Sequence, residues 1–143
     1  MRTLLLLMTC CAAVPACRTD PVTARYPVHC FQSVRADGST VSLQFIEYVD
    51  AVVGIFDYAF EDQDGAYGTF TGTLADNVIN AEWSYAIEGA QQIERILIRV
   101  DGNRAYRAHG ELVADESGEL SLKDPGNPAW SESLSRVSCD REY

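Results

Sequence analysis

Apolar and polar residues alternate with a period of two through most of the chain beyond residue 28. The clearest series places Ala81, Trp83 and Tyr85 on one face, with Glu82 and Ser84 between them. This period is that of a β-strand with one face buried. Short segments rich in Asp, Asn and Gly separate one series from the next. The pattern predicts an all-β fold, an antiparallel meander of about eight or nine strands.

The segment 90–98 is the one place where the apolar spacing also fits a helix, through Ile93, Ile96 and Leu97. Its β-branched residues and the turns on either side favour a strand instead. An open sheet of so many strands must curl, stack or close, because exposed edges pair with other chains.

A different apolar run opens the chain. Arg2 precedes it, the run covers residues 3–14, and Val14-Pro15-Ala16 forms a small-residue cleavage site. The run is shorter than the roughly 20 residues that span a bilayer as a helix. These features predict a secretory signal peptide over residues 1–16.

Two peptidases fit cleavage before Cys17. Val14 and Ala16 satisfy the ordinary signal peptidase, which leaves a soluble periplasmic product. The same residues resemble a bacterial lipobox, in which Cys17 receives a diacylglycerol, although Pro15 is not favoured there. The short apolar run favours the lipobox. We therefore expect an exported protein that an N-terminal lipid holds at a membrane.

The residues after the cleavage point refine this location. Residues 17–27 carry two prolines and no apolar periodicity, and they read as the lipidated N-terminus and a short tether. Arg18 stands where an acidic residue would retain a lipoprotein at the inner membrane. By analogy with lipoprotein sorting in Gram-negative bacteria, we expect the outer membrane, facing the periplasm.

Cysteine usage connects the leader to the fold. Of five cysteines, Cys10 and Cys11 leave with the leader, and lipidation of Cys17 leaves Cys30 and Cys139. An even pair in an exported protein predicts a disulfide, with two buried free thiols as the alternative. A disulfide between the first and last strands requires those strands to be neighbours. The domain 28–143 is therefore predicted to be a single up-and-down barrel, lipocalin- or streptavidin-like in architecture.

Charge limits the choice of partner. Removal of Arg2 with the leader changes the net charge from −10 to −11, and Lys123 is the only lysine. This acidity argues against nucleic acid as a partner. A small neutral or cationic ligand, or another envelope protein, remains open.

Catalytic and metal-binding motifs are missing from the sequence. It contains neither H-E-x-x-H, C-x-x-C nor G-x-S-x-G, and its two histidines, His29 and His109, are far apart. We therefore expect no enzyme activity, no metal and no cofactor.

Aromatic residues form the one constellation that stands out. The faces predicted to point inward carry Phe56, Tyr58, Phe60, Phe70, Trp83, Tyr85 and Tyr106. These rings either fill the barrel or leave a small cavity. In the second case Trp83 and Tyr85, whose polar tips need partners, would line the cavity. Glu88, Glu94 and Arg95 would then form its rim.

Three alternating runs carry a resemblance to known proteins: Gly54-x-Phe56-x-Tyr58-x-Phe60, Gly68-x-Phe70-x-Gly72-x-Leu74 and Ile79-x-Ala81-x-Trp83-x-Tyr85. With the leader and the two terminal cysteines, the chain resembles uncharacterised small bacterial lipoproteins that have a Cys-to-Cys antiparallel β-barrel domain. The resemblance implies a location and an architecture but no reaction.

The function expected from these features is that of a non-enzymatic envelope lipoprotein that binds a small ligand or a protein. A structural or inhibitor-like module that acts through its loops is the first alternative. An enzyme whose site is spread over several strands is the second.

Overall fold

The computed structural model describes residues 26–49 and 51–139, and within these ranges the chain forms β-strands without a helix. This part of the chain accordingly has no helix that is long and apolar enough to cross a membrane. The predicted signal peptide and the predicted lipid carrier Cys17 lie outside the described residues.

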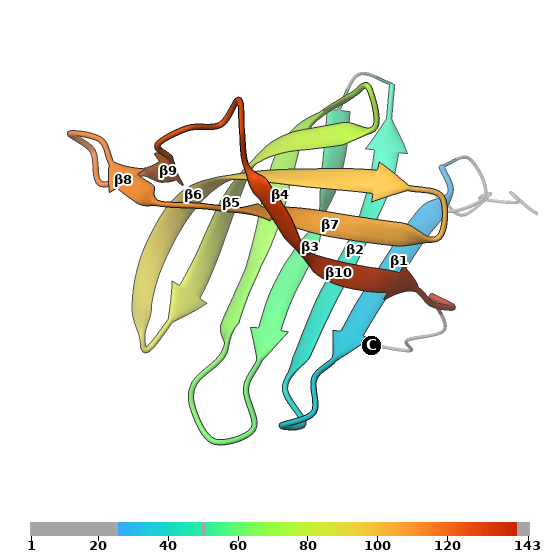
Figure 1. The fold of residues 1–143 in the computed structure, drawn as a ribbon, viewed down its shortest axis with the longest axis horizontal. Coiled ribbons are helices and arrows are strands. Elements are labelled where there is room, and N and C mark those ends of the chain that lie inside the picture. Colours follow the sequence, from blue (N-terminus) through green and yellow to red (C-terminus); the bar gives the residue numbers. More distant parts are fainter. Residues whose placement is uncertain (1–25, 50, 140–143) are drawn as a thin grey trace, which may run out of the picture.

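Ten strands follow one another along the chain (Figure 1). They are β1 (Val28–Val34), β2 (Thr40–Tyr48), β3 (Ala51–Ala59), β4 (Ala66–Ala75), β5 (Val78–Ile87), β6 (Ala90–Asp101), β7 (Arg104–His109), β8 (Leu112–Ala114), β9 (Leu120–Leu122) and β10 (Ala129–Arg136).

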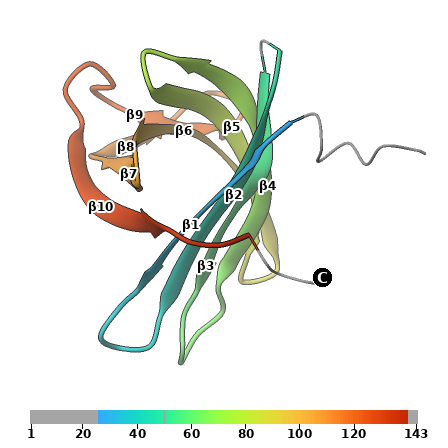
Figure 2. The same ribbon diagram turned by 90° about the vertical axis from the view of Figure 1, so that its right-hand side faces the viewer.

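Eight of these strands close a single antiparallel barrel. Strands β1 to β7 pair in chain order, and β10 lies between β7 and β1, which completes the circle seen in Figure 2. The prediction of an all-β up-and-down barrel is confirmed. Segment 90–98 is part of strand β6, as its β-branched residues indicated.

Strands β8 and β9 form a small hairpin outside the circle. Strand β7 pairs with β6 only from Ile98 to Asp101, and β9 pairs with β6 further back along the strand, at Glu94. The two strands therefore share one edge of β6. On that edge, the part of β6 around Glu94 is therefore bordered by the hairpin and not by a strand of the barrel.

The seam between the first and last strands is short. Only Phe31 and Gln32 of β1 pair with β10, opposite Arg136 and Ser135. The predicted disulfide is confirmed here, because Cys30 and Cys139 are bonded with their Cα atoms 5.5 Å apart. The sequence predicts Cys139 within the last strand, but it lies three residues beyond the end of that strand. The bond extends a seam that has few backbone hydrogen bonds.

The barrel interior is mainly apolar, and all eight strands contribute to it. Strands β7 and β10 contribute least, with Ala105 and Leu134. One inward face differs from expectation. In the β6–β7 hairpin Val100 pairs with Ala105, and Ala105 is fully buried. Tyr106 therefore points outward, where its ring lies 4.9 Å from the Arg99 guanidinium carbon. The same alternation brings Arg107 to the inner face.

Candidate functional site

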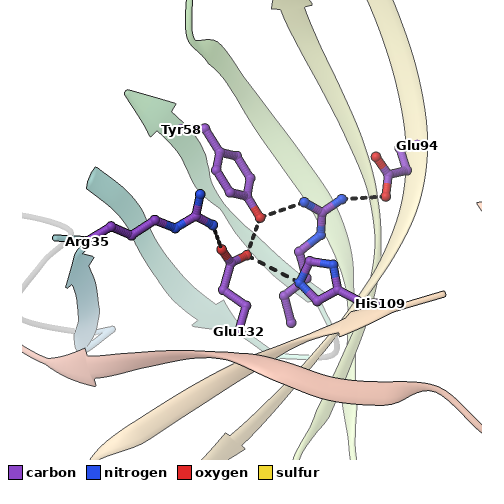
Figure 3. Close-up of polar contacts among 6 residues, drawn as sticks. Arg35, Tyr58, Glu94, His109 and Glu132 are labelled. Carbon is purple, nitrogen blue, oxygen red and sulfur yellow. Dashed lines mark hydrogen bonds and ion pairs between the residues drawn. The ribbon is translucent and has the colours of Figure 1, made fainter. Parts of the chain in front are cut away.

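A network of six ionisable side chains lies inside one end of the barrel (Figure 3). We call it the interior network, and its members are Arg35, Tyr58, Glu94, Arg107, His109 and Glu132. They come from β3, β6, β7, β10 and the residue that follows β1. The connections β1–β2, β3–β4 and β5–β6 surround this end, in the lower part of Figure 1, and we call it the polar end.

Glu132 is the centre of one half of the network. Its carboxylate accepts hydrogen bonds from Arg35 Nη2 and from the Tyr58 hydroxyl. His109 Nε2 lies 3.5 Å from Glu132 Oε2, the oxygen that also accepts from Tyr58, and this contact is longer and weaker. The Glu132 side chain is 8% exposed, whereas those of Arg35 and His109 are 43% and 41% exposed. Arg35 and His109 therefore lie at the mouth, with Glu132 behind them.

Arg107 is the centre of the other half. Its Nη1 donates to the Tyr58 hydroxyl at 2.6 Å, and its Nη2 donates to Glu94 Oε1 at 2.5 Å. Both the guanidinium and the carboxylate are almost completely buried. Such charge-assisted hydrogen bonds are the condition under which an ion pair tolerates burial.

Aromatic rings enclose the same guanidinium. The Arg107 Cζ atom lies 5.5, 5.4 and 5.5 Å from the ring centroids of Phe56, Tyr58 and Trp83. All three separations are within the range of a cation–π interaction. The cation is thus held by a carboxylate on one side and by ring faces around it.

The local pairing of β7 with β10 explains how Glu132 reaches this position. Residue pairing passes from Trp130 opposite Ala108 directly to Glu132 opposite Arg107, with an irregularity between them. A β-bulge of this kind redirects a side chain. Glu132 and Arg107 consequently share the inner face.

The surroundings shift the pKa values of three members of the network. Burial by itself would raise the pKa of Glu132, but hydrogen bonds from His109, Tyr58 and Arg35 outweigh it and lower that pKa to about 2. Burial raises the pKa of Tyr58, and the neighbouring Glu132 adds to the effect. Burial would lower the pKa of Arg107, yet Tyr58 and Glu94 raise it above its ordinary value.

These protonation states define the chemistry that the network offers. Glu132 is a carboxylate and Tyr58 a phenol throughout the neutral range, so neither exchanges a proton there. Fixed charges and hydrogen-bond donors suit binding and orientation of a ligand. Within residues 26–49 and 51–139, no group of three His, Cys, Asp or Glu side chains is arranged to hold a metal ion.

Three of the residues that the sequence singled out meet at this network. Trp83 is 2% exposed, and its ring stacks on that of Tyr85 with 3.8 Å between centroids. Glu94 stands opposite Trp83 in the β5–β6 register and belongs to the interior network. Burial raises the pKa of Tyr85, and the charge of Glu94 raises it further. Trp83 packs against the rings of Phe56 and Tyr58 and against the Arg107 guanidinium.

The other two predicted rim residues lie apart from the network. Arg95 follows Glu94 on the strand and so points to the outer face, where it pairs with Glu119 at 2.9 Å. Glu88 lies in the β5–β6 turn with a φ of 49°. Together with Asp64 and Tyr67 it lines a surface hollow of about 290 Å³ beside the polar end.

Three buried side-chain nitrogens in this region have no hydrogen-bond partner within the described chain. His109 Nε2 still lies 3.5 Å from the Glu132 carboxylate, and the other two are Trp83 Nε1 and Arg107 Nε. A buried donor left without an acceptor costs free energy, and such groups are as a rule satisfied by water or a ligand. The side chains of Trp83 and Arg107 are in contact, because the Arg107 Cζ atom lies 5.5 Å from the centroid of the Trp83 ring.

Arg107, His109 and Glu132 were not foreseen as site residues. The alternation of Arg107 and His109 with Ala108 is visible in the sequence. The sequence pattern, however, placed Tyr106 on the inner face, and this assignment is one residue out of register. Glu132 had no such signal, because its direction depends on the bulge after Trp130.

No protein-family model matches the chain, and comparisons with curated proteins and with solved structures found no match. The interior network therefore carries the functional argument.

Proposed function

We propose that this protein is a non-enzymatic envelope lipoprotein whose barrel binds a small ligand at the polar end. The observation that carries the proposal is the pair of buried donors, Trp83 Nε1 and Arg107 Nε, that lack a partner within the described chain. Donors of this kind take a ligand that presents a carbonyl, ether or hydroxyl oxygen.

The charge balance of the interior network restricts the ligand further. Two arginines face two carboxylates, and each carboxylate is already paired with an arginine. A charged ligand would enter a site whose own charges are matched, and burial of an unmatched charge is costly. A neutral molecule with an acceptor oxygen fits this site better than a cation.

The route to the donors runs past the mouth residues. Arg35 and His109 are the exposed members of the network, and both contact Glu132. Displacement of these two side chains opens the space in front of Glu132 without breaking the ion pair between Arg107 and Glu94. The mouth residues would act as a gate and the deeper ones as the binding surface.

Native mass spectrometry of protein purified from its own envelope tests the binding proposal. We expect wild type to carry one small neutral molecule per chain, and Trp83→Phe, which keeps a ring and removes the N–H group, to lose it. The matched control is Trp130→Phe, because Trp130 lies on the outer face with its ring 5.0 Å from the Arg99 guanidinium carbon. Absence of the molecule from wild type, or equal occupancy in both variants, would contradict the proposal.

The location is part of the same proposal. A lipid on Cys17 would tether the barrel to the outer membrane facing the periplasm, in keeping with its resemblance to small bacterial lipoproteins. Metabolic labelling with a palmitate analogue should mark wild type, and Cys17→Ala should lose the label. Equal labelling of the two proteins would refute the lipid anchor at Cys17 and favour the soluble periplasmic form.

A second candidate function, binding of an envelope protein, rests on the β8–β9 hairpin. Strand β8 lies at the edge of the sheet, and Leu112 and Val113 on it are 41% and 39% exposed. An exposed apolar edge is a site where another chain adds a strand. Val113→Pro should then abolish recovery of one specific envelope protein by chemical cross-linking, whereas Val34→Pro, at another exposed valine, should not.

A further inference from the structure

The end of the barrel opposite the polar end presents apolar side chains to solvent. Val49, in the β2–β3 turn, is 81% exposed, and Tyr48 beside it is 51% exposed. The ring of Tyr26, the first described residue, lies 4.7 Å from the ring of Tyr48. We call Tyr26, Tyr48 and Val49 the turn surface.

The backbone at Val49 is strained. Its φ is 53°, in the left-handed region that glycine and asparagine enter readily and a β-branched residue rarely adopts. Neither burial nor a packing contact accounts for valine at this tip, because the side chain is exposed. Strain of this kind is retained where the side chain has a role beyond folding.

The chain enters the barrel at this surface. Val28 pairs with Ile46 and the strand continues toward the polar end, so Tyr26 and the β2–β3 turn lie at the same end. Only eight residues lie between Cys17 and Tyr26, and a chain of this length reaches at most about 30 Å. An anchor at Cys17 would therefore keep the turn surface close to the bilayer.

We infer that the turn surface rests in the membrane interface, so that the polar end faces away from the membrane. This inference relies on the lipid anchor of the proposed function. Tyrosine side chains favour the interface between lipid and water, and an exposed valine gains from entering the acyl region. The acidic net charge of the chain gives no attraction to anionic lipids, so the contact depends on these apolar and aromatic side chains.

The orientation has a consequence for the proposed binding site. The connections around the polar end would open to the aqueous compartment, and a ligand would reach Arg35 and His109 from solution and not from the bilayer. The anchor supplies most of the membrane affinity, and the turn surface sets the angle of the barrel.

Photo-cross-linking in intact envelopes tests the orientation. The full chain, with its leader, carries p-benzoylphenylalanine at Val49 in one variant and at Tyr48 in a second. The matched control places the same residue at Val34, a valine that is 68% exposed at the polar end. We expect covalent attachment of radiolabelled phospholipid at Val49 and Tyr48, at least tenfold above that at Val34.

The possible outcomes distinguish a wrong orientation of the barrel from the absence of a lipid anchor. Lipid attachment at Val34 equal to that at Val49, or attachment of Val49 to a protein instead of lipid, would overturn the orientation. Membrane fractionation of the same samples reports on the anchor. Protein that fractionates with membranes but shows no lipid attachment at Val49 or Tyr48 refutes the turn surface alone. Protein that stays in the soluble fraction refutes the anchor, and the inference with it.

Discussion

Arg107 on β7 and Glu94 on β6 form an ion pair inside the barrel, with 2.5 Å between Nη2 and Oε1 and both side chains almost completely buried. The ion pair connects β7 with the part of β6 around Glu94. Strand β7 does not pair with that part of β6, which pairs with β9 instead. The ion pair therefore serves both the fold and the proposed site.

Replacement of Arg107 by methionine should lower the free energy of unfolding by about 3–5 kcal/mol, because it leaves the Glu94 carboxylate buried without its cation. Chemical denaturation gives the value. Arg95→Met is the control, since Arg95 pairs with Glu119 on the exposed face, and such pairs contribute about 0–1 kcal/mol. A loss no larger for Arg107→Met than for Arg95→Met would contradict the buried ion pair.

Stability should also depend on pH through Glu132. Its pKa is lowered from 4.5 to about 2 on folding, so the unfolded chain binds the proton more readily. The contribution of this carboxylate is complete above about pH 4.5 and is lost as the pH falls toward 2. Glu132→Gln should flatten the fall in stability across this window.

Denaturation at a series of pH values measures the effect, and Glu61→Gln controls for the loss of one negative charge on an exposed loop residue. If Glu132→Gln and wild type lose stability in parallel from pH 4.5 to 2, the ionised carboxylate is not held by the interior network.

Loss of the disulfide should weaken the barrel at its seam. Cys30 and Cys139 close a loop of 109 residues beside strands that share only two residue pairs. Replacement of both by serine should cost roughly 2–5 kcal/mol of stability. Non-reducing peptide mapping should recover the two cysteine peptides joined, and free thiols at both positions would refute the pairing.

The fold followed from the sequence because a barrel strand shows one apolar face and one polar face. The series through Ala81, Trp83 and Tyr85 marks the inner side of β5 directly. The two cysteines then indicated which strands had to meet. The extra hairpin of β8 and β9 was harder to foresee, since strands of three residues leave little alternation to detect.

The interior network was only partly accessible to the same reasoning. Trp83 and Tyr85 were placed correctly inside because their strand alternates cleanly. Arg107 was not, because an arginine on an inward face breaks the apolar pattern and shifts the inferred register toward Tyr106. Its burial depends on Glu94 and Tyr58, which are 13 and 49 residues away in the chain, and such partners appear only when the barrel closes.

A high-resolution crystal structure of the protein purified from its own envelope tests the central claim most directly. The account predicts density for a multi-atom molecule at the polar end, with acceptor oxygens about 2.7–3.2 Å from Trp83 Nε1 and Arg107 Nε. Density for isolated water molecules alone at both nitrogens, or hydrogen bonds from both to other atoms of the chain, would contradict it.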